Sequence, residues 1–262
     1  MSTPHSERAS GLEVLGRLLP FVYAAIFIVA VWLAVVAIFK PHESLLPQPW
    51  AVARHLGELI VSGELFRHIG ASLTRVLSAW CLAAVIAIPL GLAMGRIPRF
   101  EHLVDPVVEL IRPISPLAWI PLAILWFGIG EFGKIFVVLV GTFFPTLIST
   151  VAGVKRIDPV LIHAGQVLGC NDRTSLFHKV VLPAALPNII TGLRISFGTG
   201  WAAIIAAELV AARSGLGYLI SNGMEILRAD KVLVGMVVIG VLGVAFDALF
   251  RFIHRRISWG AV

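Results

Sequence analysis

Residues 155–183, with the sequence KRIDPVLIHAGQVLGCNDRTSLFHKVVLP, form the longest polar interruption in this chain. Asp158 followed by Pro159 is a typical helix start, because a carboxylate can cap the first turn and proline fits its first position. The next apolar residues share one helical face, and they are Val160, Leu161, Ala164, Val167 and Leu168. Gly169 is a typical helix stop. The segment therefore begins with a predicted short amphipathic helix.

A second short helix is predicted directly after the first. Asn171 and Asp172 can cap its start, and Pro183 is expected to end it because proline interrupts helical hydrogen bonding. Its apolar face is formed by Leu176, Phe177, Val180 and Val181. The whole segment is thus predicted to be two capped helices joined at Gly169.

Two interpretations suit this pair of helices. In the first, Leu161, Leu168 and Phe177 anchor the pair under a helical bundle, and polar side chains meet a partner protein. Those polar residues are His163, Gln166, Asn171, Arg173 and His178. In the second, the pair is a hairpin that lies on the membrane surface. The pattern by itself fits both.

The composition places the rest of the chain in a membrane. Of its 262 residues, 58% are hydrophobic and only 14% are charged, against roughly 25% charged in soluble domains. The mean hydropathy is +0.93. The basic residues behind the net charge of +6 lie between apolar blocks, whereas nucleic-acid binding needs clustered, accessible Lys and Arg.

Six apolar blocks each approach the roughly 20 residues that a helix needs to cross the hydrocarbon core. They are residues 20–39, 73–94, 107–127, 135–154, 184–210 and 232–252. Helices are expected because backbone groups in lipid must be paired within the segment. The predicted fold class is an all-α membrane protein with six transmembrane helices. Residues 1–19 are expected to form a cytoplasmic segment, and residues 20–262 the transmembrane domain.

The basic residues indicate the orientation. With the N-terminus inside, eleven lie in cytoplasmic segments and seven outside, which is the bias that the positive-inside rule predicts. The cytoplasmic set is Arg8, Arg17, Arg96, Arg99, Lys155, Arg156, Arg173, Lys179, Arg251, Arg255 and Arg256, and the outside set is Lys40, Arg54, Arg67, Lys134, Arg213, Arg228 and Lys231. Both termini and residues 155–183 are then expected in the cytoplasm.

Placing a charged side chain at membrane depth costs free energy, so such residues mark a function or a partner. Glu208 lies in a long apolar stretch. It is expected to pair with Arg194 or with an arginine of another span, either as a structural ion pair or as a gate. Arg75, Glu109 and Arg112 lie near predicted span ends, where they can also snorkel to the interface.

The polar segment resembles the EAA motif of bacterial ABC-importer permeases. That motif runs Glu-Ala-Ala, three residues, Gly, about nine residues and Ile-x-Leu-Pro. The matching residues are His163-Ala164-Gly165, Gly169 and Val180-Val181-Leu182-Pro183. His163 replaces the acid and Gly165 replaces the second alanine, so an ion pair made by that acid is not expected here.

Further stretches, from about Glu43 to the C-terminus, resemble the taurine, sulfonate and nitrate branch of these permeases. They are Ala71–Arg75, Arg112–Leu122, Leu125–Glu131, Leu182–Pro187, Thr191–Arg194, Ala206–Leu209 and Gly215–Tyr218. The resemblance implies the type I importer permease fold, with residues 155–183 as the cytoplasmic coupling loop. It also implies a multi-pass protein of the bacterial inner membrane.

The resemblance implies partners as well. They are a second copy of the permease, two ATPase subunits and a periplasmic binding protein that delivers a small anion such as taurine, an alkyl sulfonate or nitrate. The chain has no Walker A sequence, so ATP and Mg are expected on the ATPase. No catalytic residue, cofactor or metal is expected in this chain.

Two groups of candidate residues follow, the first from the resemblance and the second from the chemistry of the side chains. The coupling-loop group is Asp158, Leu161, His163, Ala164, Gly165, Leu168, Gly169, Asn171, Arg173 and Phe177. The substrate-path group is Arg112, Arg194, Ser196, Thr199, Trp201 and Glu208, because an anion path favours positive and hydrogen-bonding groups.

Two other functional classes compete with this reading. A secondary transporter with no ATPase partner would show internal repeats, and the sequence shows none. An intramembrane enzyme would need a metal-ligand spacing such as His-Glu-x-x-His or a nucleophile elbow. Neither pattern is present in the sequence.

Overall fold

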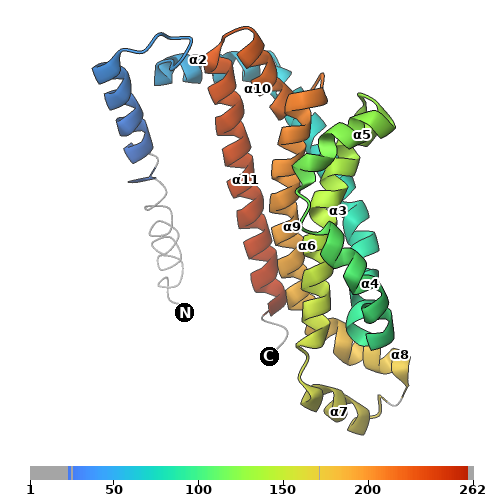
Figure 1. Cartoon of the computed structure of the whole chain (residues 1–262). Helices are drawn as coiled ribbons and strands as arrows, with labels where there is room; N and C mark the ends of the chain where they lie inside the picture. Colours follow the sequence, from blue (N-terminus) through green and yellow to red (C-terminus); the bar gives the residue numbers. More distant parts are fainter. Residues whose placement is uncertain (1–22, 25, 171, 259–262) are drawn as a thin grey trace, which may run out of the picture.

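The computed structural model describes residues 23–24, 26–170 and 172–258, and every regular element within them is a helix. Four long helices stand side by side (Figure 1). They are α3 (Glu64–Arg96), α6 (Glu131–Lys155), α9 (Leu182–Ala211) and α11 (Ala229–Ser258). Helix α6 packs most extensively, with α3 on one side and α9 on the other. The all-α membrane fold is therefore confirmed.

The spans differ from the prediction in one place. Four helices in the described part are long and apolar enough to cross a membrane. A fifth span is broken: α4 (Pro98–Ile111) and the pair formed by a 3₁₀ turn (Pro116–Trp119) and α5 (Ile120–Phe127) meet at 81°. The predicted continuous helix over residues 107–127 is therefore wrong, because two prolines, Pro113 and Pro116, follow Arg112 and interrupt helical hydrogen bonding there.

The first predicted span is only partly visible. Residues 20–22 and 25 lie outside the described residues, and Ile26–Phe39 is an apolar helix shorter than a full span. This helix stands apart from α11 (Figure 1).

Short helices cover one end of the bundle. They are α2 (Pro49–Val61) and α10 (Leu216–Glu225), and they lie at the end opposite the polar loop (Figure 1). Val52 and Leu59 of α2 are buried on one face of the helix. Helix α10 packs against both α9 and α11.

Small residues let α9 approach α6 closely. A Cβ atom on Gly200 would lie 2.4 Å from Cγ2 of Thr142. Thr142 itself is fully buried, and its hydroxyl donates to the carbonyl of Val138 at 2.9 Å. In lipid, where helices gain little from the hydrophobic effect, such close packing supplies much of the association.

Gly200→Val is therefore expected to destabilise the bundle by about 1–3 kcal/mol, the usual cost of overpacking. Thermal unfolding of the detergent-purified protein checks this. Gly198→Val on the same helix is the matched control, because no atom lies within 4 Å of a Cβ atom built there. Equal shifts of the midpoint in both variants would contradict the packing argument.

Candidate functional site

Both helix starts in the polar loop are capped as predicted. Oδ1 of Asp158 accepts a hydrogen bond from the Val160 amide at 2.8 Å, at the start of α7 (Pro159–Val167). Oδ2 of Asp172 accepts from the Ser175 amide at 2.9 Å, at the start of α8 (Arg173–Leu176). Hydrogen bonds to Ser175 lower the pKa of the Asp172 carboxyl. The two caps therefore fix the points at which α7 and α8 begin.

Gly169 separates the two helices with a φ of +96°. Its amide donates to the carbonyl of Gln166 at 3.1 Å, and the amide of Cys170 donates to the carbonyl of Gly165 at 2.9 Å. A left-handed backbone after a helix favours glycine. The predicted stop at Gly169 is confirmed. Asn171 and the side chain of Arg173 lie outside the described residues.

Pro183 does not end the second helix, contrary to the prediction. A π-helical turn (Phe177–Val181) precedes α9, and helix runs from Thr174 to Ala211. The amide of Leu182 bonds the carbonyl of Phe177, five residues back. This wider turn rearranges the hydrogen bonds just before a residue that has no amide proton to donate.

The apolar face of α7 is exposed and does not pack against the bundle. Leu161 is 51% exposed and Leu168 is 84% exposed, so the predicted anchoring by these two residues is wrong. The neighbouring Val160 and Val167 are exposed as well. Periodicity identified the apolar face correctly, but it carries no information on which face packs inward. Four apolar side chains are therefore presented outside the bundle.

Helix α7 packs through its glycine instead. Gly165 is buried, and a Cβ atom there would lie 2.7 Å from Cγ2 of Val180. Leu176 and Val181 are buried beneath it, and Phe177 is half-buried. The glycine that departs from the EAA pattern is thus the residue that allows α7 to close onto the second helix. His163 and Ala164 are exposed.

A hollow of about 730 Å³ opens between α7 and the start of α9. Its α7 wall is formed by Leu161, Ala164, Gly165 and Leu168, and its other wall runs from Lys179 to Pro187. Four coupling-loop candidates, Leu161, Ala164, Gly165 and Leu168, therefore line one hollow, and His163 lies outside it.

Glu208 lies at the opposite end of α9, 1% exposed, and it pairs with Arg75 rather than with Arg194. Nη1 of Arg75 donates to its Oε1 at 2.7 Å, and the amide of Gly217 donates to its Oε2 at 3.0 Å. The hydroxyl of Ser72 also lies within 2.9 Å of the carboxylate. Glu208 is enclosed by donors, which favours the structural ion pair over a gate.

Arg75 also binds a second carboxylate. Its Nη2 donates to Oε1 of Glu131 at 2.9 Å and to the hydroxyl of Ser214 at 2.9 Å. Nζ of Lys134 lies 2.8 Å from the same Glu131 oxygen. The network joins α3, α6, α9 and the turn before α10.

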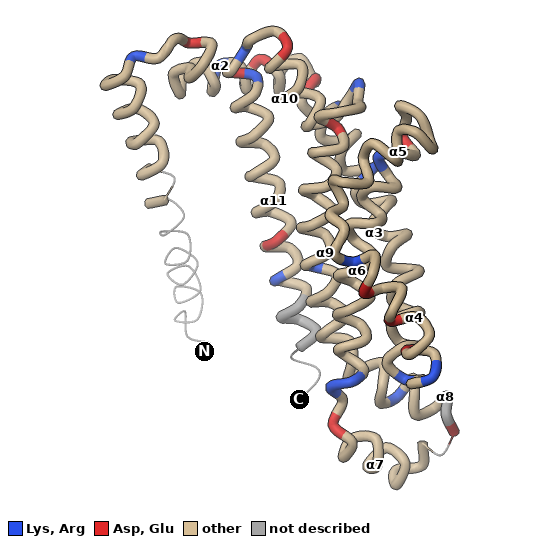
Figure 2. The backbone as a smooth tube through the Cα atoms, viewed as in Figure 1, with Lys and Arg blue, Asp and Glu red and all other residues tan. Residues whose placement is uncertain are grey.

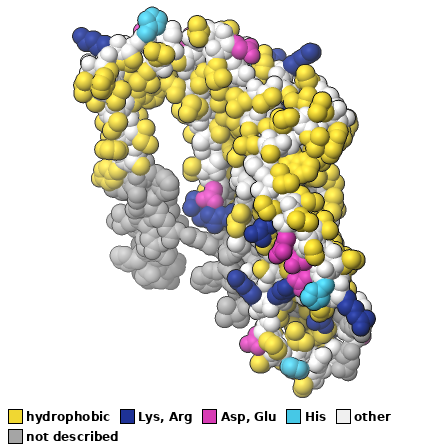
Figure 3. Space-filling model, in the orientation of Figure 1, with side chains coloured by type: hydrophobic (Ala, Val, Ile, Leu, Met, Phe, Trp, Pro, Cys, Tyr) yellow, Lys and Arg dark blue, Asp and Glu magenta, His cyan; other side chains and the backbone are white. Residues whose placement is uncertain are grey.

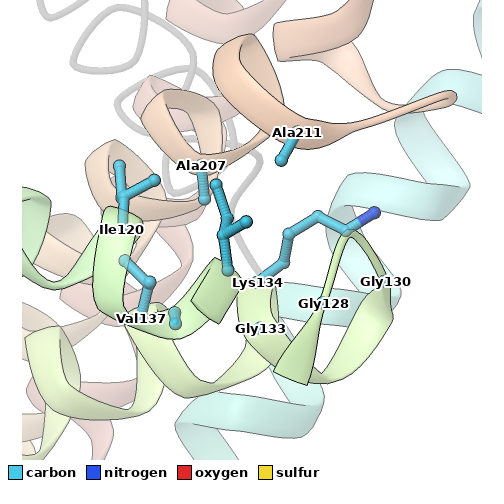
Figure 4. Close-up of a pocket in the computed structure, with 10 residues that line it drawn as sticks. Ile120, Gly128, Gly130, Gly133, Lys134, Val137, Ala207 and Ala211 are labelled. Atoms are coloured by element: carbon cyan, nitrogen blue, oxygen red, sulfur yellow. The ribbon is translucent and has the colours of Figure 1, made fainter. Parts of the chain in front are cut away.

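A small crevice lies beside this network, under the α5–α6 turn (Figure 4). Gly128, Gly130, Ile120 and Ala207 line it, and the Lys134 side chain runs along it (Figure 4). Its volume of about 10 Å³ is about that of one water probe, so it cannot hold a substrate.

Three other path candidates hold α9 against its neighbours. Nη2 of Arg194 binds Oδ1 of Asp247 on α11 at 2.7 Å. The fully buried hydroxyl of Ser196 accepts a hydrogen bond from Nε1 of Trp80 on α3 at 3.1 Å. Nε1 of Trp201 donates to the carbonyl of Ile239 on α11 at 3.3 Å. These three residues do not lie in the hollow that contains the remaining two candidates.

Arg112 and Thr199 do share a hollow, of about 230 Å³, at the break between α4 and α5. Pro145 lines it too and has no amide proton for the carbonyl of Gly141. The hydroxyl of Thr199 donates to that carbonyl at 2.9 Å instead. Arg112 is therefore the cationic group of this hollow, while the Thr199 proton is already used.

One polar feature was missed in the sequence. Asp105 and His102 lie on the same face of α4 as Glu109 and Arg112, at spacings of three or four residues. The signal was readable as a helical period. The apolar block over residues 107–127 obscures it, because that block predicts a single uninterrupted span that starts inside the stripe.

Residues 87–259 match the family described as binding-protein-dependent transport system inner membrane component. The chain belongs to this family. It is a multi-pass membrane permease, and curated relatives align over most of its length. The taurine transport system permease protein TauC of Escherichia coli (strain K12) is 40% identical over 238 residues, covering 88% of this chain and 86% of that protein.

Other relatives carry different substrate names. The putative aliphatic sulfonates transport permease protein SsuC of Bacillus subtilis (strain 168) is 35% identical over 92% of this chain and 86% of its own length. The bicarbonate transport system permease protein CmpB of Synechococcus elongatus is 36% identical over 74% of this chain and 69% of its own.

Solved structures agree with the fold. The inward-facing methionine ABC transporter MetNI aligns with a TM-score of 0.65 at 22% identity, over 75% of this permease and 97% of that chain. An amino acid ABC transporter aligns with a TM-score of 0.60 at 17% identity, over 77% of this permease and 97% of that chain.

Glu208→Gln is expected to destabilise the permease by about 3 kcal/mol, because it leaves the buried Arg75 without its enclosed counter-charge. Thermal unfolding in detergent measures this. Glu131→Gln is the matched control, since the Glu131 side chain is 56% exposed and exposed pairs contribute about 0–1 kcal/mol. A smaller shift for Glu208→Gln than for Glu131→Gln would contradict the structural role.

Gly169→Pro is expected to deform the junction between α7 and α8, because proline cannot adopt the positive φ and has no amide for Gln166. The protein should still insert, but trypsin should cut the loop faster than in the wild type. Gly169→Asn is the control, since asparagine tolerates the left-handed region. Unchanged proteolysis of Gly169→Pro would be the contrary result.

Proposed function

We propose that this chain is the permease subunit of an ATP-driven importer for a small anion such as taurine, an alkyl sulfonate or nitrate. Two copies would form the path, each would carry one ATPase subunit, and a periplasmic binding protein would deliver the substrate. The relatives named for taurine and for aliphatic sulfonates support the substrate class. ATP and Mg would bind to the ATPase subunits.

The observation that carries this proposal is the exposed apolar face of α7. Val160, Leu161 and Val167 of this nine-residue helix, and Leu168 directly after it, are each more than half exposed. Apolar surface of this kind is stabilised when a partner removes it from water. Capped ends and the Gly165 contact hold the face outward, which suits insertion into a groove of the ATPase.

The remaining assignments follow from this docking. Residues 155–183 would be the coupling loop of a transmembrane domain over residues 20–262, on the cytoplasmic side with residues 1–19 and both termini. Asp158, Gly165, Gly169 and Phe177 would set the shape of the loop. Leu161, Ala164 and Leu168 would enter the partner, and His163 would lie at the edge of the contact with Asn171 and Arg173.

Motion of the ATPase would reach the membrane through α9. The helix is continuous from Thr174 in the loop to Ala211, and it carries Glu208 of the ion-pair network at its far end. A shift of the docked α7 would therefore reach both the Arg112 hollow and the far end of the bundle. A secondary transporter would not need such a connection.

Leu168→Asp is expected to lower the amount of co-purified ATPase at least tenfold, equivalent to about 1.4 kcal/mol, and to abolish ATP-driven uptake. The reason is a charge placed in an apolar contact. Gln166→Asp is the matched control, because it adds the same charge to the opposite face of α7, which does not enter the partner when the apolar face docks.

Retention of the complex and of uptake in Leu168→Asp would contradict the docking proposal. Active uptake by the chain alone, reconstituted in vesicles without any ATPase, would favour a secondary transporter.

A further inference from the structure

A stripe of ionisable residues runs along α4, formed by His102, Asp105, Glu109 and Arg112. Successive residues in a helix are rotated by about 100°, so these four fall within roughly a quarter of the circumference. Figure 2 shows acidic positions along α4, and Figure 3, in the orientation of Figure 1, shows acidic, basic and histidine side chains gathered over this part of the molecule. The exposed apolar residues Leu103, Val107 and Leu110 occupy another face of the same helix.

The charged stripe has no partner in the described part of the chain. His102, Glu109 and Arg112 are exposed and Asp105 is half-buried. None of the four forms a hydrogen bond or ion pair through its side chain with a described residue. A neighbouring charged residue does have a partner: Glu101, just before the stripe, forms an ion pair with Lys155.

The stripe lies within the broken fifth span. Helix α4 and the α5 segment qualify as a span only together, and Arg112 stands at their 81° junction. Charged side chains in hydrocarbon are expensive, and irregular backbone at membrane depth occurs where it is buried in protein or lines a water-filled cavity. The stripe therefore lies on a surface that is in contact with water, and the apolar face of α4 is suited to contact lipid or another protein.

The stripe ends at the hollow that Arg112 shares with Thr199. Its volume of about 230 Å³ corresponds to several water molecules at about 30 Å³ each, which leaves room for a small solute. Arg112 can bind an anionic group there through its planar fork of donors. Glu109 and Asp105 follow about one and two turns below, where they would repel a simple anion and attract a cation.

We propose that Arg112 and Glu109 form a binding position for a small zwitterion in the transport path. The sulfonate or carboxylate group binds Arg112, and the ammonium group binds Glu109, with Asp105 adding to the attraction. This inference rests on the proposed importer function and narrows its substrate class from anions in general to molecules that carry both charges.

Thiol accessibility tests whether the stripe is wet. In a Cys81→Ser, Cys170→Ser background, Glu109→Cys and Arg112→Cys are compared with Val107→Cys and Leu110→Cys. A membrane-impermeant methanethiosulfonate reagent is added to the permease–ATPase complex in nanodiscs. The two stripe positions should react at least tenfold faster than the two apolar ones. Equal rates at all four positions would overturn the proposal.

Ligand binding tests the substrate class. The same complex, without binding protein, is dialysed against radiolabelled taurine, or against ethanesulfonate, which lacks the ammonium group. Taurine should bind at least tenfold more tightly. Glu109→Gln should remove that difference, and Arg112→Gln should weaken both ligands. Arg99→Gln, an exposed arginine beyond the stripe, is the control.

Equal affinity for both ligands, or no taurine binding to the wild type, would overturn the zwitterion site. Uptake and ATPase co-purification are measured on the same preparation with the binding protein restored. If these persist while the ligands are not distinguished, the site proposal fails and the importer function stands. If the wild type shows neither uptake nor ATPase co-purification, the importer function itself is contradicted.

Discussion

The buried ion pair between Arg75 and Glu208 is the constraint on which the arrangement of this bundle depends. A charged group in a membrane protein needs a counter-charge and hydrogen bonds, since neither water nor lipid supplies them in the interior. Glu208 receives donors from α3 and from the start of α10. Because Arg75 also holds Glu131 at the start of α6, one guanidinium links three spans and the turn before a short helix, at the end of the bundle far from the polar loop.

Below that pair, the packing depends on small residues and on polar groups that replace missing backbone bonds. Gly200 brings α9 against Thr142 of α6. One residue before each of these, Thr199 satisfies the Gly141 carbonyl that Pro145 leaves free. Because the Thr199 hydroxyl takes the place of the missing Pro145 amide, α6 can contain a proline beside a hollow without leaving a carbonyl unpaired in lipid.

Local features were predictable from the sequence and long-range ones were not. The caps at Asp158 and Asp172 and the turn at Gly169 depend on a few neighbouring residues, so they could be predicted. The partner of Glu208 is 133 positions away in the chain, and hydropathy gives no information on which arginine it meets. The direction of the apolar face of α7 depends on the Gly165–Val180 contact, which no periodicity encodes. The stripe on α4 was missed because the break at Arg112 was not recognised.

Because the helix is continuous from Thr174 to Ala211, a rotation at its loop end displaces its far end. At about 1.5 Å per residue, its 38 residues correspond to roughly 57 Å along the axis. A tilt of about 5° about the loop end would displace the far end by roughly 5 Å, about one helical turn. A small rotation at the loop therefore produces a larger displacement at the far end of α9. The stiffness of the π-helical turn at Phe177–Val181 determines how much of the rotation is transmitted to that end.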